Sequence, residues 1–141
     1  MGKEKRFLKK KFVIVFIVIF ICILSVLIAA KGIVSNMQAN LEQMADLEIQ
    51  NVDLTKIPDG TYAGSCKVFP ISVKVDVTIN NYKITRIELV EHRNGQGTPA
   101  EIIPDKVVKA QSLEVDIVTG ATYSSKAILK AIENALNSSS K

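Results

Sequence analysis

The hydrophobic pattern divides the chain into three parts. Residues 12–30 form an uncharged, almost wholly apolar run. From residue 31 to about residue 55, hydrophobic side chains recur every three or four positions among polar ones, which is the period of an amphipathic helix. From about residue 58 onward, hydrophobic and polar residues alternate, as in strands with one buried face. The pattern therefore predicts an apolar helix, a helical stalk and a folded domain.

The apolar run is long enough to cross a membrane. Its 19 residues span about 28 Å as a helix, close to the ~30 Å of a hydrocarbon core. Residues 1–11 carry six Lys or Arg and one Glu, a local charge of +5. By the positive-inside rule, this tail stays in the cytoplasm and the domain lies outside. The sequence thus predicts a single-pass protein of the cell membrane, with the lipid bilayer as a partner.

A cleaved signal peptide is the alternative interpretation of this segment. The apolar run exceeds the usual hydrophobic region of about 7–15 residues. Residues 28–30, Ile-Ala-Ala, also place a bulky side chain where a signal peptidase needs a small one. These two observations favour an uncleaved anchor.

The net charge and the numbers of His and Cys residues exclude several kinds of site. The whole chain has a formal net charge of +4, so residues 12–141 sum to −1. Without a net positive field the domain is not expected to bind nucleic acid. One histidine and two cysteines, Cys22 and Cys66, exclude a histidine-based metal cluster and a disulfide within the domain. Cys66 is expected to be a small buried apolar residue.

The stalk has two interpretations. It could be a dimerising coiled coil, or a helix that packs on its own domain or spaces it from the bilayer. The pattern covers barely two heptads, which is too few for a coiled coil and favours the second interpretation. Pro58 and Gly60 mark the boundary. The predicted parts are a basic tail, an anchor, a stalk or linker and a domain, over residues 1–11, 12–30, 31–57 and 58–141.

The domain is predicted to be α+β, an antiparallel sheet with two helices on one face. Alternation predicts strands over 61–69, 71–80 and 82–91, with a tight turn at Asn80-Asn81. A slip in the third strand's alternation predicts a bulge near Thr85-Arg86.

Beyond the third strand, residues 92–97 are predicted to form a polar loop. A helix should follow, with Thr98 as its cap and Glu101 as the partner in a capping box. A short strand is expected over 113–117, and a final helix over 123–136.

Residues 116–122, Asp-Ile-Val-Thr-Gly-Ala-Thr, precede the final helix. Thr122, Ser124 and Ser125 are residue types that cap helices, and a helix N-terminus attracts phosphate through its free N–H groups. Gly120 and Ala121 would let a phosphate approach the backbone. From these residues alone, an ordinary turn with Ser and Thr caps remains the favoured interpretation.

Residues 116–122 also match the pattern D-x-x-[ST]-G-A-T. This resembles the FMN-binding domain family, which includes the covalent-flavin subunits of the sodium-pumping NADH:quinone reductase and its Rnf relatives. The similarity covers about residues 59–136, and includes residues 92–97, 100–101, 110–112 and 126–136.

The resemblance implies that Thr122 receives FMN through a phosphoester bond. A flavin transferase would make this bond, with FAD as donor and a divalent metal. It also implies an electron carrier with no catalytic residues of its own, working with a membrane quinone or NADH dehydrogenase-type redox partner and an external acceptor. The alternative is a non-redox FMN-binding, sensory or structural module.

Other site residues follow from the same resemblance. Asp116 would orient the acceptor hydroxyl or serve recognition by the transferase; its alternative role is a turn residue that binds local N–H groups. His92 is placed with equal weight near the flavin or in an exposed loop. The remaining expected cofactor contacts are Thr119, Gly120, Ala121, Tyr123, Ser124 and Ser125.

Overall fold

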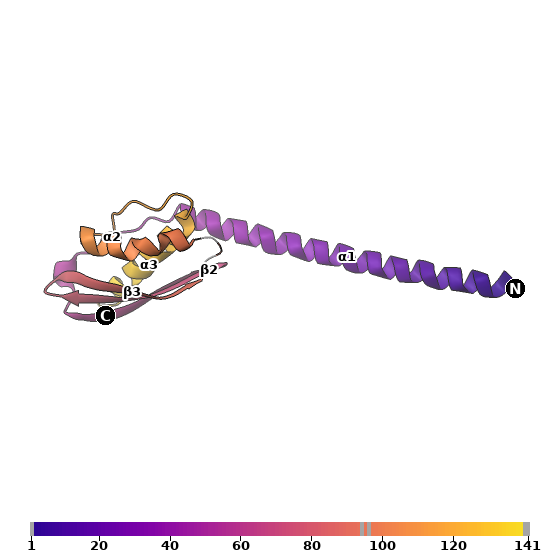
Figure 1. Ribbon diagram of the computed structural model, residues 1–141, viewed down its shortest axis with the longest axis horizontal. Coiled ribbons are helices and arrows are strands. Elements are labelled where there is room, and N and C mark those ends of the chain that lie inside the picture. The colour runs from indigo at the N-terminus through magenta and orange to yellow at the C-terminus, as the bar shows by residue number, and fades with distance from the viewer. Residues whose placement is uncertain (1, 94, 96, 140–141) are drawn as a thin grey trace. The chain divides into compact units, whose positions relative to one another are not determined.

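The structure is a computed structural model that describes residues 2–93, 95 and 97–139, with side chains from residue 11 onward. It contains two compact units, Met1–Gln38 and Ala39–Lys141. The first consists of most of helix α1 (Gly2–Ala45). The second holds the sheet and the other helices (Figure 1).

Helix α1 carries the predicted apolar run. Its large hydrophobic side chains are exposed, with Phe16 at 69% and Phe20 at 67%. Within the described residues, Lys11–Ala45 is long and apolar enough to cross a membrane. A helix that is apolar all round needs an apolar environment, which agrees with a membrane anchor.

The sheet has three antiparallel strands in the order β1-β2-β3, and the predicted α+β class is confirmed (Figure 1). The strands are β1 (Gly60–Val68), β2 (Ile71–Asn80) and β3 (Lys83–Arg93). Side-chain alternation decides which face is buried, as predicted. The β2 residues on this face are all buried: Ile71, Val73, Val75, Val77 and Ile79.

Strand β3 contains two bulges. Its register passes from Arg86 opposite Thr78 to Ile84 opposite Ile79, which skips Thr85 and confirms the predicted bulge. A second shift, which the alternation pattern did not predict, skips Val90 and leaves its side chain 56% exposed.

The hairpin turn between β2 and β3 lies one residue later than predicted. Asn81 and Tyr82 have positive φ angles of 50° and 59°. Two central residues in this region are typical of a type I′ turn. Asn80 belongs to the strand because it pairs with Lys83, so the predicted Asn80-Asn81 turn was wrong.

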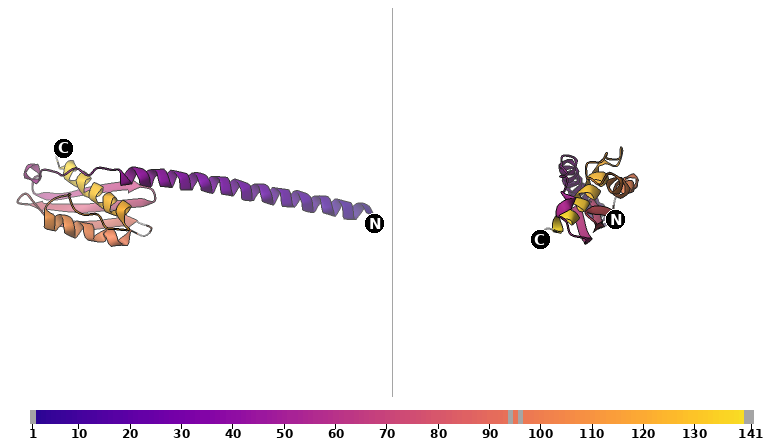
Figure 2. Two further views of the ribbon diagram at one scale, coloured as in Figure 1. Left: turned by 90° about the horizontal axis from the view of Figure 1, so that it is seen from above. Right: turned by 90° about the vertical axis from the view of Figure 1, so that its left-hand side faces the viewer.

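Two helices cover the buried face of the sheet (Figure 2). Helix α3 (Thr122–Ser138) packs on β1 and β2, and α2 (Ile103–Ala110) packs on β3. The backbones of α3 and β1 meet at Gly64. A Cβ on Gly64 would lie 2.6 Å from the backbone nitrogen of Ala135 and would also contact the carbonyl oxygen of Ala131. Asn134 donates from Nδ2 to the Ser65 carbonyl at 2.9 Å, beside this contact.

The helix predicted to start at Thr98 differs from the observed one. A 3₁₀ helix, η2 (Thr98–Ile102), precedes α2, and its N-cap position is occupied by Gly97. The predicted capping box is wrong, because Thr98 lies inside the helix and the Glu101 carboxylate accepts from His92 Nδ1 at 2.9 Å. Pro104 lies in the first turn of α2, where a missing N–H costs nothing.

The strand predicted over residues 113–117 is also wrong, because this segment is irregular. Backbone N–H groups of this region donate to side-chain oxygens instead of to a neighbouring strand. Leu113 N–H donates to Asn51 Oδ1 at 3.2 Å. Next along the chain, Val118 N–H donates to Ser125 Oγ at 3.1 Å.

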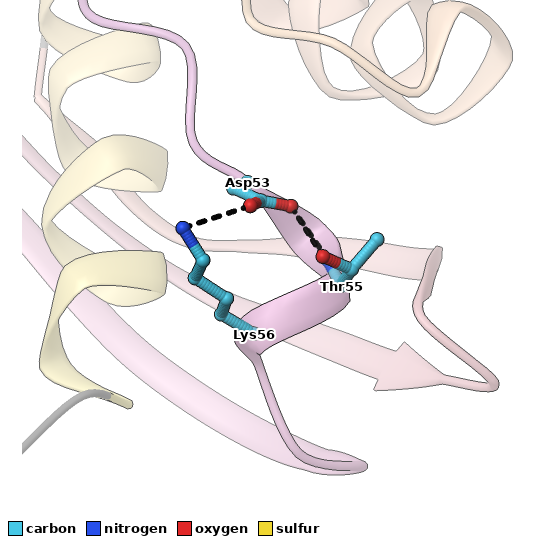
Figure 3. Close-up of polar contacts among 3 residues, drawn as sticks. All are labelled: Asp53, Thr55 and Lys56. Atoms are coloured by element: carbon cyan, nitrogen blue, oxygen red, sulfur yellow. Dashed lines mark hydrogen bonds and ion pairs between the residues drawn. The ribbon is translucent and has the colours of Figure 1, made fainter.

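The segment before the sheet packs on the domain. Met44 and Ile57 are 3% exposed and belong to the core. Asp53 caps a short helix, η1 (Leu54–Lys56), by accepting from Thr55 N–H at 3.1 Å and Thr55 Oγ1 at 2.6 Å. Its other oxygen lies 3.1 Å from Lys56 Nζ (Figure 3). The bond from the Thr55 hydroxyl lowers the pKa of the Asp53 carboxyl most, followed by the bonds from Lys56 and from Thr55 N–H.

Substituting Gly64 tests how α3 is held on the sheet. Gly64→Ala must push α3 away from β1, and we expect a loss of about 1–3 kcal/mol in the free energy of unfolding. Gly60→Ala is the matched control, because a Cβ there meets its nearest atom, Tyr62 Oη, at 3.4 Å. Urea unfolding of the full chain in detergent, followed by tyrosine fluorescence, measures both. The three tyrosines all lie in the domain. Equal stabilities of the two variants would contradict this packing.

Candidate functional site

A tight turn leads into helix α3. Ala121 N–H donates to the Val118 carbonyl at 3.0 Å. Gly120 has a φ of +80°, which favours glycine, and a Cβ there would meet nothing within 4 Å. Ala121 is the N-cap, with φ −129° and ψ 35°, and Thr122 is the first helical residue. The backbone at Gly120 therefore faces open space directly before the helix.

No side chain caps this helix in the described part of the chain. The caps predicted from Thr122, Ser124 and Ser125 are therefore wrong, because all three residues lie inside α3. A helix begins with N–H groups that lack intrahelical partners. The start of α3 consequently offers backbone donors and the positive end of its dipole.

The hydroxyl groups of the motif differ in exposure. Thr119 is exposed, Thr122 is half-buried, and Tyr123 is 38% exposed. Ser124 and Ser125 are buried, at 3% and 0%.

Ser125 has a structural role. Its Oγ accepts from Val118 N–H at 3.1 Å, and its own N–H donates to the Ala121 carbonyl at 2.9 Å. Ser125 thus fastens the turn to the first turn of α3.

Asp116 lies in the irregular segment between α2 and α3 and is exposed. Its backbone carbonyl accepts from Lys106 Nζ at 3.0 Å, which ties the segment to α2. Its carboxylate makes no hydrogen bond to a described residue, so a role as a turn-stabilising side chain finds no support. The carboxylate is available to a group outside the chain.

His92 does not lie in an exposed loop. His92 and Arg93 are the last residues of β3, so the predicted loop over 92–97 starts too early. The imidazole is 3% exposed, and its Nδ1 lies 2.9 Å from Glu101 Oε1. The predicted loop residues 94 and 96 lie outside the described residues. His92 therefore joins β3 to η2.

The end of β3 and the start of α3 lie at the same end of the sheet. Asn134, late in α3, binds the Ser65 carbonyl, whereas Lys130, one turn earlier, lines a cleft with Lys67 and Val68 at the end of β1. Helix α3 therefore runs antiparallel to β1, with its start near the β1–β2 hairpin. His92 lies opposite Val73, near the start of β2. The fold thus brings two sequence-distant parts of the predicted site to one end of the domain.

Lys126, one helical turn after Thr122, has a role that the sequence pattern did not predict. Its ammonium donates to the Leu47 carbonyl at 3.0 Å and also to the Ala45 carbonyl. These contacts join residues about 80 positions apart. In the sequence, only the four-residue spacing between Thr122 and Lys126 pointed to this lysine, because it places both residues on one helix face.

The domain is similar in sequence to known proteins. Residues 70–137 match the family described as FMN-binding domain. The C-terminal domain belongs to this family. Cys66, in strand β1, is half-buried, and this burial raises the pKa of its thiol.

The FMN-binding domain also has relatives among larger proteins. The chain is 33% identical over 93 residues to an NADH:acrylate oxidoreductase of Vibrio harveyi, covering 64% of this chain and 9% of that protein. It is 41% identical over 68 residues to a urocanate reductase of Eggerthella lenta, covering 46% and 11%. It is 28% identical over 102 residues to an uncharacterized protein of Treponema pallidum, covering 70% and 28%. The chain spans about a tenth of the two reductases.

The described residues of the FMN-binding domain fit this cofactor. A phosphate group fits at the start of α3, where the backbone at Gly120 faces open space and the helix has no side-chain cap. The half-buried Thr122 is the first residue of this helix. The described residues contain no group of three or more His, Cys, Asp or Glu side chains placed to hold a metal ion. The family match supports a flavoprotein role for the domain.

Ser125→Ala tests whether this hydroxyl holds the turn. The change removes the acceptor of Val118 N–H, and we expect the free energy of unfolding to fall by about 1–3 kcal/mol. Ser124→Ala is the matched control: Ser124 is equally buried, and its hydroxyl makes no hydrogen bond among the described residues. We expect a smaller loss for it by the same urea unfolding. A loss for Ser124→Ala as large as that for Ser125→Ala would show that Ser125 has no special role.

Proposed function

We propose that this chain is a membrane-anchored electron carrier whose FMN is covalently bound through a phosphoester to Thr122. The observation that carries the proposal is the position of Thr122 as first residue of α3, two residues after the open backbone at Gly120. A helix N-terminus with nearby unobstructed backbone is a favourable place for a phosphate.

Thr122 suits the attachment better than Thr119. Its hydroxyl is on the helix itself, next to the N–H groups that stabilise phosphate oxygens. Thr119 is exposed on the far side of Gly120 and lacks this setting. Ser124 and Ser125 are buried and not accessible to a modifying enzyme. The family motif likewise has its acceptor at the last threonine.

The surrounding residues have separate roles in this proposal. The first N–H groups of α3 hold the phosphate, and Ser125 keeps the turn in place. The exposed Asp116 carboxylate serves recognition by the flavin transferase, which uses FAD and a divalent metal. Tyr123, 38% exposed, lines the approach to the cofactor, and the buried His92 supports the same end of the sheet through Glu101. Bound FMN supplies the redox chemistry, and the protein positions it.

The anchor and the relatives support the relay. Helix α1 is suited to cross a membrane, and the basic tail favours a cytoplasmic N-terminus with the domain outside. Two relatives are reductases by name, so related domains occur in redox proteins. The domain relays electrons between a membrane quinone or NADH dehydrogenase-type system and an external acceptor.

Substitutions at the two threonines test the attachment site. We expect Thr122→Ala to abolish covalent flavin, because it removes the reacting oxygen, and to leave the domain folded. Thr122→Ser keeps that oxygen and should retain some attachment. Thr119→Ala is the control and should reduce attachment at most. Each variant is produced together with a flavin transferase, and fragmentation mass spectrometry of the tryptic peptide 110–126 locates the flavin.

Two results would contradict the assignment to Thr122. One is flavin on another residue of peptide 110–126 in the wild-type chain. The other is covalent flavin retained by Thr122→Ala. Urea unfolding of the same preparation shows that the variant is folded, so a loss of flavin cannot be attributed to a loss of structure.

Protease treatment of intact protoplasts tests the topology. The basic residues of 1–11 favour a cytoplasmic N-terminus. We therefore expect added protease to digest the domain and leave a fragment that contains the apolar part of α1. A cytoplasmic protein serves as the control for intact protoplasts. Survival of the full-length chain, together with its digestion after lysis, would place the domain in the cytoplasm.

A further inference from the structure

One end of the domain carries an exposed aromatic side chain among basic ones. Phe69, in the β1–β2 hairpin, is 63% exposed. The groove beside it is lined by Lys67, Lys74, Glu91 and Arg93. An exposed aromatic ring next to cationic side chains is the combination that binds the interface of an anionic membrane.

The basic side chains of this end are only partly neutralised. Lys74 Nζ lies 2.6 Å from Glu91 Oε2, and Arg93 Nε lies 3.8 Å from Glu91 Oε1. Lys67 makes no ion pair among the described residues. Within the groove, one carboxylate therefore faces three cations. Asp76 lines the adjoining cleft with Lys67 and Lys74, so the count of this end with that cleft is three cations to two carboxylates, whereas residues 12–141 as a whole carry −1. The positive charge is a local feature of this end.

The membrane tether joins the domain at this same end. The second compact unit begins at Ala39, and Met44 and Leu47 line a cleft together with Cys66 and Val68 at the end of β1. The ammonium of Lys126 binds the carbonyls of Ala45 and Leu47. The end of α1 thus lies beside the last residues of β1, which lead into the Phe69 hairpin.

The length of the connection keeps the domain near the membrane. From the end of the apolar run at Ala30 to Ala39, the chain bridges at most about 30 Å even when fully extended. The polar headgroup layer takes up roughly 5–8 Å of this span on each side of the bilayer. The tethered end therefore stays close to the bilayer surface and can contact it without any change in the domain.

The other end of the sheet provides a contrast. Tyr82, in the β2–β3 hairpin, is 60% exposed, as much as Phe69. The two hairpins lie at opposite ends of β2, whose ten residues span about 30 Å. Exposure of an aromatic ring alone does not distinguish the two ends of the sheet. The end with Phe69 differs in that the end of α1 is bound there by Lys126 and that Lys67, Lys74 and Arg93 line the groove.

We propose that the Phe69 hairpin, with Lys67, Lys74 and Arg93, docks on the anionic lipid headgroups of the membrane that anchors the chain. Phe69 enters the interface, and the three cations contact lipid phosphates. Because the start of α3 lies at this end, docking brings Thr122 toward the bilayer surface. The inference rests on the proposed membrane anchoring, and it does not depend on covalent attachment of FMN.

Tryptophan substitution tests the docking, because the chain contains no tryptophan. Phe69→Trp and the matched control Tyr82→Trp are each placed, as full chains, in vesicles of phosphatidylcholine with or without phosphatidylglycerol. Brominated lipids quench a tryptophan that touches the bilayer. In vesicles with phosphatidylglycerol we expect several-fold more quenching for Phe69→Trp than for Tyr82→Trp. Adding Lys67→Glu to Phe69→Trp should lower the quenching.

Three results would overturn the docking proposal: equal quenching at the two positions, stronger quenching at Tyr82→Trp, or quenching that is the same with and without phosphatidylglycerol. Flotation of the vesicles checks the anchoring separately. Protein that does not float with the vesicles contradicts the membrane anchor itself, whereas protein that floats without selective quenching contradicts only the docking.

Discussion

The contact between the backbones of α3 and β1 at Gly64 determines the position of the candidate site. Without a side chain there, α3 lies directly on the sheet, and Asn134 binds the neighbouring Ser65 carbonyl. This contact holds the C-terminal half of α3, and the bonds from Lys126 to the Ala45 and Leu47 carbonyls hold its first turns. The turn at Gly120 and the Thr122 hydroxyl are therefore held near the β1–β2 hairpin, on a rigid support.

The sequence was sufficient where one local pattern decides the structure. Strict alternation in β2 correctly predicted its buried face, and the slip near Thr85 correctly predicted a bulge. Predictions failed where partners come from elsewhere in the chain. The backbone N–H of Leu113 donates to the Asn51 side chain instead of to a neighbouring strand, so the expected strand is absent. The carboxylate of Glu101 accepts from His92 instead of from a helix N-terminus, so the expected capping box is absent.

The candidate site could be predicted in part for the same reason. Its motif is contiguous, so residues 116–122 identified the turn and the helix start directly. The sequence did not show that Ser125 fastens the turn or that Lys126 binds the end of α1, because both roles depend on tertiary contacts. The structure also shows that the start of α3 and the tether meet at one end of the domain. In the proposed electron carrier, the flavin is therefore attached at the end of the domain where Lys126 binds the Ala45 and Leu47 carbonyls.

The most direct measurement of the central claim, that this domain holds FMN covalently, is the intact mass of the denatured full chain. The chain is produced with and without a flavin transferase in the same host. We expect the transferase to add the mass of one FMN less one water, and this mass to remain after denaturation. An unchanged mass in both preparations, from a host in which the transferase modifies another substrate, would contradict covalent attachment.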